Sequence, residues 1–395
     1  MKIGSKTANF CTIMKKQIQR YCPLGKELES SVFLFGARQT GKSTFLEQTF
    51  KDAIFFDLLD SGTKRRFERR PELLFELLQN EPSDRIVIID EIVEVPTLLN
   101  EVHRLIQKKD MRFILCGSSA RKLKHHSYNT LGGRARPCYF YPFVSAELPN
   151  LNLDHALLYG MLPPHYLSKN PHDALAGYVD IYLKEEIKEQ ALVRKIEGFQ
   201  RFLEAAALTN AEIINYSNIA SDCGVSAKAV KEYFSILEDS LIGYIIPSYT
   251  RVKKRKVVQS PKFYFFDVGI YNYIMGRTSL APGTAEYGHC FEHFVIQELV
   301  AYIGYTHNRK RLSYWHTYND KEIDAVIGEA EIGIEIKSTE EVLPKHIATF
   351  KEYSDEFPES RCIVVSRDCM SRTMGRVECL YIFDFLRKLW AGELF

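Results

Sequence analysis

The segment GARQTGKST, from residue 36 to residue 44, fits the pattern GxxxxGK[ST] of a phosphate-binding loop. It follows the apolar run VFLF and precedes STFLEQTF, which is typical of a helix. In such a loop the glycines let backbone N–H groups surround phosphate oxygens, and the helix directs its positive end at the same anion. The pattern therefore predicts an ATP site. The residues expected to contact ATP are Gly36, Ala37, Arg38, Gln39, Thr40, Gly41, Lys42, Ser43 and Thr44.

Four side chains have specific roles in this chemistry. Lys42 is expected to contact the β- and γ-phosphates, and Ser43 to ligate Mg²⁺. The second half of such a site is an apolar strand that ends in an acid, and IVIIDE supplies it at residues 86–91. Asp90 would hold Mg²⁺ through its water shell, and Glu91 would polarise the attacking water. Lys42, Asp90 and Glu91 are thus the predicted catalytic residues of an ATPase.

Two further residues are candidates for contact with the nucleotide. The apolar run FILCG is followed by Ser118, whose hydroxyl is placed to sense the γ-phosphate; a helix cap is the alternative. The Gly-rich segment LGGRAR carries Arg134. An arginine here would stabilise transition-state charge in the same chain or on a neighbouring subunit. A surface ion pair is the alternative for Arg134.

A second constellation follows near the C-terminus. EIDAVI is followed after a short turn by IGIEIKS, which gives the D-x(n)-E-x-K pattern of PD-(D/E)xK nucleases. Glu335 and Lys337 are two residues apart on a predicted strand, so both face one side, and a hairpin would bring Asp324 beside them. These three residues are the predicted catalytic residues of a nuclease-like site.

This second site would use a divalent cation. Asp324 and Glu335 would hold Mg²⁺ or Mn²⁺, and Lys337 would orient the hydrolytic water. Glu292, on the predicted helix FEHFVIQEL, is the expected further metal ligand, and Glu298 on the same helix is the less favoured choice. The same fold without catalysis, used as a binding module, is the alternative.

The middle of the chain contains a predicted helix-turn-helix. In NIASDCGVSAKAVK, Gly224 supplies the turn and Ser226 caps the second helix. The run RVKKRK at 251–256 places five positive charges among six residues, as in a basic wing, and would contact DNA phosphates. A winged helix that only packs against the ATPase, with a solvated charge run, is the alternative.

The positions of these motifs predict the elements that must hold them. Apolar runs alternate with helical stretches up to about residue 147, which predicts a parallel α/β sheet. The pattern is helical up to about residue 247 and mixed afterwards. We expect a P-loop AAA+-type domain at 1–150, a helical region with a winged helix at 151–260, and a nuclease-like α/β domain at 261–395.

Taken together, these motifs resemble a family of bacterial and archaeal AAA+-type ATPases known from sequence. In that family a C-terminal domain of unknown function, with a nuclease-like core, follows the ATPase. The resemblance covers nearly the whole chain and is carried by GARQTGKS, IIDEI, ILCGSSARKL, LGGRA, YPFVSAEL, GMLPPHYL, SPKFYFFDVGIYNYIMG and EIDAVI with IEIKS. Two positions depart from it: Val93 stands where the family usually carries Gln, and His316 where it tends to carry Arg.

The amino-acid composition limits the classes of protein to which the chain can belong. The 395 residues are 46% hydrophobic and 26% charged, the profile of a globular protein of two or three domains. A net charge of +2 means that any contact with nucleic acid comes from a local patch. Nine cysteines without CxxC pairs fit a reducing compartment. No apolar run has the length of a signal peptide's core or of a membrane helix, so we expect a cytoplasmic protein without a membrane partner.

The sequence thus favours one function and leaves a second open. The first is an ATP-hydrolysing P-loop ATPase that acts on DNA and carries a metal-dependent nuclease site in its C-terminal domain. The second is an ATP-regulated switch that binds DNA or protein and whose nuclease-like domain does not cleave. Assembly into a homo-oligomer is compatible with both.

Overall fold

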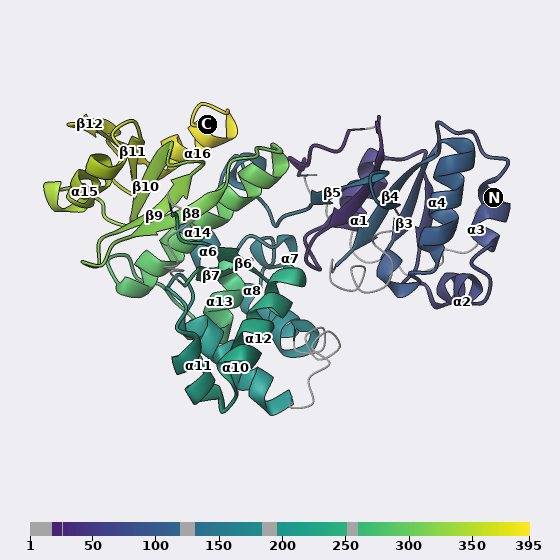
Figure 1. Cartoon of the computed structure of the whole chain (residues 1–395), viewed down its shortest axis with the longest axis horizontal. Helices are drawn as coiled ribbons and strands as arrows, with labels where there is room; N and C mark the ends of the chain where they lie inside the picture. Colours follow the sequence, from purple (N-terminus) through teal and green to yellow (C-terminus); the bar gives the residue numbers. More distant parts are fainter. Residues whose placement is uncertain (1–17, 26, 119–130, 184–195, 251–259) are drawn as a thin grey trace.

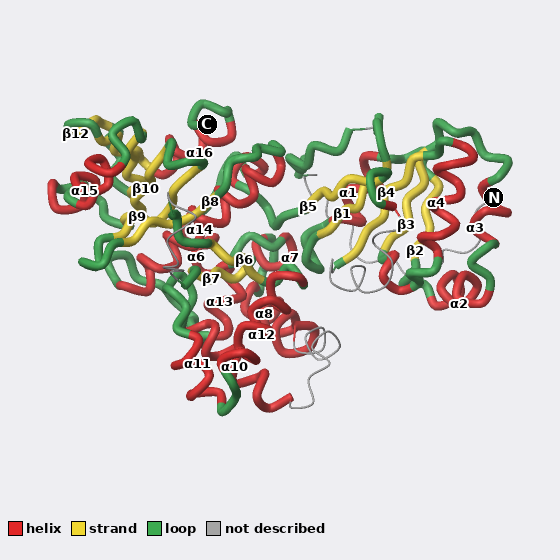
Figure 2. The backbone as a smooth tube through the Cα atoms, in the orientation of Figure 1, coloured by secondary structure: helices red, strands yellow, loops and turns green. Residues whose placement is uncertain are grey.

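The computed structural model describes residues 18–25, 27–118, 131–183, 196–250 and 260–395. One sheet lies at each end of the long axis, and the helices of the middle region lie below their junction (Figure 1). Figure 2 shows helices packed around the strands of both sheets. The α/β class expected from the sequence is confirmed.

The N-terminal sheet has five parallel strands in the order β2-β3-β4-β1-β5. Strand β1, which lies between β4 and β5, is buried along its whole length, as a parallel strand covered on both faces must be. The first four strands coincide with the predicted apolar runs. The Gly-rich segment forms a turn at residues 132–134, as expected, and the fifth strand begins directly after it. The strands are β1 (Ser31–Phe35), β2 (Ile54–Asp57), β3 (Ile86–Asp90), β4 (Arg112–Gly117) and β5 (Ala135–Tyr139).

Helices cover both faces of this sheet. Leu98, Val102 and Leu105 of α4 pack with Phe33 and other β-strand side chains in one core cluster. Phe45 and Leu46 of α1 belong to a cluster on the opposite face. The helices are α1 (Lys42–Thr49), α2 (Ser61–Arg69), α3 (Leu73–Leu78) and α4 (Leu98–Lys109).

The middle region is helical, as expected. Its helices are α6 (Leu153–Tyr159), α7 (Pro163–Tyr166), α8 (Pro171–Ala176), α10 (Ile196–Leu208), α11 (Tyr216–Cys223) and α12 (Ala227–Asp239), with a π-helical turn at Gly177–Leu183. Gly224 ends α11 in the left-handed region, at φ 66°, and the Ser226 side chain accepts from the Ala229 N–H at the start of α12. Both features are those predicted for the helix-turn-helix. The basic run at 251–256 lies outside the described residues.

The boundary between the second and third domains lies later than residue 260. Strand β6 (Gly243–Ile246) pairs with β7 (Lys262–Phe265), so a division after residue 260 would split a two-stranded sheet. The next helix, α13 (Val268–Ile274), packs on α6, and Asp267 at its N-cap accepts from the Met161 N–H at 2.6 Å. The helical region therefore extends to the start of the long helix that follows.

The C-terminal domain is a mixed six-stranded sheet in the order β12-β13-β11-β10-β9-β8. Strands β8, β9 and β10 are antiparallel, and β10, β11 and β13 are parallel. Its strands are β8 (Leu312–His316), β9 (Glu322–Ile327), β10 (Ile332–Lys337), β11 (Arg361–Ser366), β12 (Arg372–Met374) and β13 (Val377–Tyr381). Its helices are α14 (Ala285–Tyr305), α15 (Thr349–Glu356) and α16 (Ile382–Trp390).

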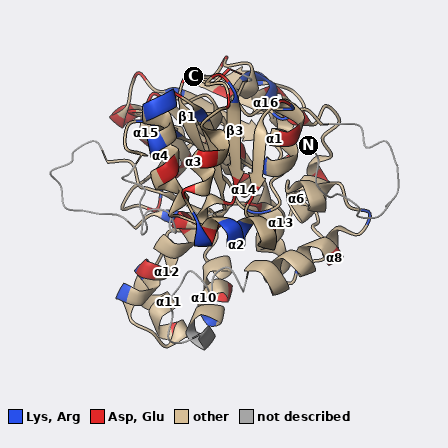
Figure 3. Cartoon of the chain, turned by 90° about the vertical axis from the view of Figure 1, so that its right-hand side faces the viewer, with Lys and Arg blue, Asp and Glu red and all other residues tan. Residues whose placement is uncertain are grey.

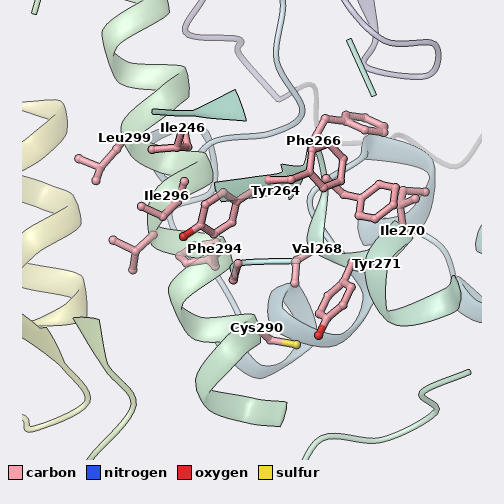
Figure 4. Close-up of a cluster of buried hydrophobic side chains, with 14 of the residues drawn as sticks. Ile246, Tyr264, Phe266, Val268, Ile270, Tyr271, Cys290, Phe294, Ile296 and Leu299 are labelled. Atoms are coloured by element: carbon pink, nitrogen blue, oxygen red, sulfur yellow. The ribbon is translucent and has the colours of Figure 1, made fainter. Parts of the chain in front are cut away.

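One continuous core joins the helical region to the C-terminal sheet. Figure 4 shows side chains of β6, β7, α13 and α14 in one cluster, with Tyr264 and Phe294 near its centre. The same core includes Ile334 and Ile336 of β10. Because these parts share buried side chains, the 21-residue helix α14 is held by both of them.

The distribution of charge and the state of the cysteines agree with what the amino-acid composition indicates. In the ribbon of Figure 3, basic and acidic residues alternate along the described segments that face the viewer, in line with the net charge of +2. Every cysteine within the described ranges has a free thiol. In those ranges, no helix has the combination of length and apolar character that crossing a bilayer requires.

Helix α14 also contacts the end of the N-terminal domain through a buried acid. Glu298 accepts from the Ser145 N–H at 2.8 Å, the Ser145 hydroxyl at 2.7 Å and the Trp390 indole N–H at 2.6 Å. Burial raises the pKa of Glu298 to about 7. This places the less favoured acid of the sequence analysis in a domain contact, away from the predicted nuclease-like site.

We expect Glu298→Gln to flatten the pH dependence of stability. The folded chain keeps a proton on Glu298 up to about pH 7, whereas the ordinary pKa is 4.5. Wild-type stability should therefore fall as the pH rises between these values, by roughly 3 kcal/mol, and the variant should lose less. Urea denaturation followed by the fluorescence of Trp315 and Trp390 measures this, with exposed Glu352→Gln as the control. Equal slopes for wild type and Glu298→Gln would contradict the expectation.

Candidate functional site

The predicted phosphate-binding loop connects β1 to α1, at the carboxyl edge of the parallel sheet. Gln39 and Gly41 adopt positive φ angles of 64° and 93°. The Thr40 hydroxyl donates to the Ala37 carbonyl at 2.9 Å, which closes the loop on itself. Gly41 is the N-cap of α1 and has no side-chain cap, so the first N–H groups of α1 remain available to an anion.

Lys42 lies inside the loop with its side chain almost fully buried. Its ammonium group donates to the carbonyls of Gly36 and Ala37 at 2.6 and 3.0 Å. Burial lowers the pKa of Lys42, while the nearby carboxylates of Glu91 and Asp90 raise it. The ammonium group is thus fixed at the centre of the loop, where an anion would meet it.

The acids at the end of β3 lie beside the loop. The Ser43 hydroxyl donates to the Asp90 carboxylate at 2.6 Å. Glu91 has a positive φ of 54°, and its carboxylate accepts from both the N–H and the hydroxyl of Ser118, at 3.1 and 2.6 Å. The structure therefore brings together Lys42, Ser43, Asp90, Glu91 and Ser118, as the sequence predicted.

Gly36 has a steric reason to be glycine. A Cβ atom there would lie 2.4 Å from the carbonyl oxygen of Phe140, just after β5. The Phe140 N–H donates in turn to the Phe35 carbonyl at 2.6 Å. The start of the loop is thus packed against the segment that leaves β5.

The other predicted nucleotide contacts differ in position. The Arg38 guanidinium lies 4.7 Å from the ring centre of Tyr182 in the helical region, and Gln39 and Thr44 are exposed. Arg134 is exposed just before β5, whose first residue pairs with Ser31 at the start of β1. Because the two strands are parallel, Arg134 lies at the amino edge of the sheet, roughly 15 Å from the loop. Of the alternatives for Arg134, this position fits action on a neighbouring subunit or a surface role better than action within the same chain.

The predicted residues of the C-terminal site also come together. Lys337 Nζ lies 2.6 Å from the Glu335 carboxylate and 3.8 Å from that of Asp324. Asp324 accepts from the Ile336 N–H at 2.6 Å, across the β9–β10 pairing. Burial and the neighbouring Asp324 raise the pKa of Glu335 to about 8, and burial raises that of Asp324. The oxygen Oε2 of Glu335 is buried and has no hydrogen-bond partner within the described residues.

Glu292 is bound by residues that sequence analysis did not consider. Lys262 Nζ lies 3.3 Å from the Glu292 carboxylate and also pairs with Glu322. The Tyr264 hydroxyl donates to the same Glu292 oxygen at 2.7 Å. Burial raises the pKa of Glu292, whereas the positive charge of Lys262 lowers it. The pKa of Glu292 is lowered overall.

These contacts describe the surroundings of the predicted metal ligands. In the described parts of the chain, no three His, Cys, Asp or Glu side chains are arranged to hold one metal ion. Lys337 Nζ lies within 3.8 Å of the carboxylates of both Asp324 and Glu335, and the contacts of Glu292 with Lys262 and Tyr264 are both made by its Oε1. The unpartnered buried oxygen of Glu335 fits a cation ligand, with Asp324 beside it and Glu292 as the expected further ligand.

Two residues near these sites were missed by the sequence analysis. Lys262 stands in the buried strand KFYF, where a lone charge among aromatic residues is a signal for a buried ion pair. Arg20 contacts the phosphate-binding loop from the N-terminal segment, and no motif surrounds it. Only the fold brings Arg20 to the loop.

Three family models match consecutive parts of the chain. Residues 29–148 match an AAA domain, residues 150–281 match a domain of unknown function, DUF8612, and residues 287–382 match a second domain of unknown function, DUF4143. A comparison with curated proteins found no match.

Among solved structures, the chain is similar to the Orc1 protein of Aeropyrum pernix in complex with DNA. The identity is 12%, over 63% of this chain and 87% of that one, with a TM-score of 0.26. No conclusion about function follows from a TM-score of this size.

We expect Lys262→Met to destabilise the protein far more than a matched change on the surface. The substitution leaves Glu292 buried without its counter-charge, which typically costs about 3–5 kcal/mol. Lys310→Met is the control, because Lys310 pairs with Glu331 at 2.6 Å in a more exposed position, where a pair contributes about 1 kcal/mol or less. Urea denaturation of both variants measures the difference. Similar decreases in the free energy of unfolding for the two variants would show that the buried Lys262–Glu292 pair stabilises the protein no more than the surface pair does.

Proposed function

We propose that this chain, whose residues 29–148 form an AAA domain, binds ATP at the loop of residues 36–44 and hydrolyses it. The observation that carries the proposal is the convergence of Lys42, Ser43, Asp90 and Glu91 on one point at the sheet edge. Ligands of α/β sheets bind at this carboxyl edge. A buried ammonium group held by carbonyl oxygens alone is also prepared to receive an anion.

Phosphate binding would use groups that are already in place. Lys42 would transfer its donors from the Gly36 and Ala37 carbonyls to the β- and γ-phosphates. The N–H groups at the start of α1 would surround the same oxygens. Since the lysine is already positioned, little side-chain ordering remains to oppose binding.

The Ser43–Asp90 pair fits Mg²⁺. A hydroxyl and a carboxylate oxygen lie 2.6 Å apart, and oxygen donors of this kind are the ligands that Mg²⁺ prefers. Ser43 would ligate the ion and Asp90 would hold its water shell. The ion would supply charge neutralisation on the phosphates.

Glu91 is the proposed general base. Ser118 fixes its carboxylate with two hydrogen bonds, so the carboxylate is oriented before substrate arrives. From this position it would accept a proton from the attacking water. Ser118 would then act by orienting Glu91, a role different from the γ-phosphate sensor expected from the sequence.

We expect Lys42→Ala and Glu91→Gln to separate binding from hydrolysis. Loss of the lysine should weaken ATP binding, whereas Glu91→Gln should keep binding and lower kcat by roughly 100-fold or more, because only the base is lost. Fluorescent-nucleotide titration and phosphate release measure the two quantities, with exposed Lys51→Ala as the control. Wild-type turnover in Glu91→Gln would refute its assignment as the base.

A second activity is proposed for the C-terminal domain: cation-dependent cleavage of a phosphodiester, with DNA as the substrate. The supporting observation is the unpartnered Oε2 of Glu335 beside Asp324, in a partly buried group of four acids and two lysines. With all four acids ionised, as ligands of a metal must be, they exceed the lysines by two charges, which suits one divalent cation. Asp324 and Glu335 would hold the ion, and Lys337 would position water.

A switch that binds DNA without cutting it is the competing proposal. The exposed Lys228 and Lys231 of α12 are available for phosphate contacts, and the sequence of the run 251–256 adds basic charge. In this proposal ATP regulates DNA association and the C-terminal domain only binds. Association with DNA should then weaken steeply with added salt. Both proposals for the C-terminal domain are compatible with ATP hydrolysis at the N-terminal site.

We expect Asp324→Asn to abolish Mn²⁺ binding and any metal-dependent nicking of plasmid DNA. Removal of one of two carboxylate ligands leaves too little charge to hold the ion. Isothermal titration with Mn²⁺ and a plasmid assay measure the two effects, with exposed Asp355→Asn as the control. Mn²⁺ should be titrated into nucleotide-free Asp90→Asn chains, so that binding by Ser43 and Asp90 at the ATP site does not contribute. DNA binding without cutting in wild type would favour the switch.

A further inference from the structure

Arg20 makes an unusually complete set of contacts beside the phosphate-binding loop. Its guanidinium donates to the Thr40 carbonyl at 2.5 Å, to the Glu147 carboxylate at 3.0 Å and to the Tyr141 and Pro142 carbonyls at 2.7 and 3.1 Å. The same group packs over two aromatic rings, those of Phe140 and Phe143, at 4.3 and 5.0 Å. The Arg20 side chain is only 7% exposed.

Only arginine can make this set of contacts. Four acceptors in different directions need the planar fork of guanidinium donors, and lysine offers a single charged point on a flexible stem. Glu147 is fixed independently, because it also accepts from the Tyr21 and Val144 N–H groups at 2.6 and 3.2 Å. The arginine is therefore held firmly on the side away from the loop.

The bond to Thr40 constrains the loop itself. In a planar trans peptide the carbonyl and the following N–H point in opposite directions. Because Arg20 holds the Thr40 carbonyl, the Gly41 N–H is directed away from Arg20. A side chain at Gly41 would also crowd the arginine, since a Cβ there would lie 3.2 Å from its Nη1. Arg20 and Gly41 thus fit each other closely.

We propose that Arg20 is a positioning residue of the phosphate-binding loop. It sets the Thr40–Gly41 peptide so that the Gly41 N–H donates to the bound phosphates, and it anchors this peptide to the segment 140–147 that follows β5. The inference rests on the proposed binding of ATP and adds a residue that lies outside the loop motif. Since the Tyr141 N–H also donates to the Tyr305 hydroxyl of α14 at 3.1 Å, the anchor continues into the C-terminal domain.

Two substitutions in the full-length chain separate positioning from a structural role. Arg20→Lys keeps the positive charge near Glu147 but loses the fork that holds Thr40. Glu147→Gln removes the charge of the ion pair but leaves Arg20 free to hold Thr40. Arg85→Lys is the control, because Arg85 pairs with Glu81 at 2.8 Å on the surface. Each protein is titrated with a fluorescent ATP analogue below its unfolding temperature, and KM, kcat and the thermal midpoint are measured.

We expect Arg20→Lys to raise the Kd and KM for ATP roughly tenfold or more, as the loss of one charge-assisted hydrogen bond that orients a phosphate donor implies. Glu147→Gln should lower the thermal midpoint and keep the Kd within about twofold of wild type. ATP affinity at the wild-type level in Arg20→Lys would overturn the role of Arg20. The role of Arg20 would also be overturned if both variants lost ATP affinity in proportion to the decrease in their thermal midpoints. A wild-type chain that does not bind ATP would overturn the proposed function itself.

Discussion

The rest of the structure depends on the burial of strand β1 between β4 and β5 in a parallel sheet. Parallel pairing brings the carboxyl ends of β1, β3 and β4 to one edge, and with them the loop after Phe35, the acids after Ile89 and Ser118. Residues from three distant segments therefore meet without any of them being near the others in sequence. On the other side of β1, strand β5 brings Phe140 against Gly36 and fixes the start of the loop.

Both candidate sites depend on lysines, buried or half-buried, whose ammonium groups have partners. Lys42 is held by backbone carbonyls, whereas Lys262 and Lys337 are held by carboxylates. A buried ammonium group is tolerated only with such partners. The partners of each lysine therefore indicate which charge its site lacks. The ATP site has a cation that lacks a bonded anion, and the C-terminal site has acids that exceed their cations. The first arrangement suits a phosphate ligand and the second suits a divalent cation.

The sequence predicted most of the features that depend on local residue patterns. Four strands of the first sheet, the caps at Gly224 and Ser226, and the meeting of Lys42 with Asp90 and Glu91 follow from apolar runs and motifs. What it could not predict depends on tertiary placement. The segment Ala135–Tyr139 became a strand because β1 offered an open edge, and this placed Arg134 at the amino edge of the sheet. Arg20, Lys262 and the partners of Glu292 come from segments that no motif marks.

The most direct test of the account is a crystal structure of the chain with Mg²⁺ and a non-hydrolysable ATP analogue. We expect Lys42 to leave the Gly36 and Ala37 carbonyls for the β- and γ-phosphates, while Ser43 and Asp90 approach the ion. Ser118 should still hold Glu91 beside the γ-phosphate. A nucleotide bound elsewhere, or a Lys42 that keeps its bonds to the loop carbonyls with the analogue present, would contradict the central claim.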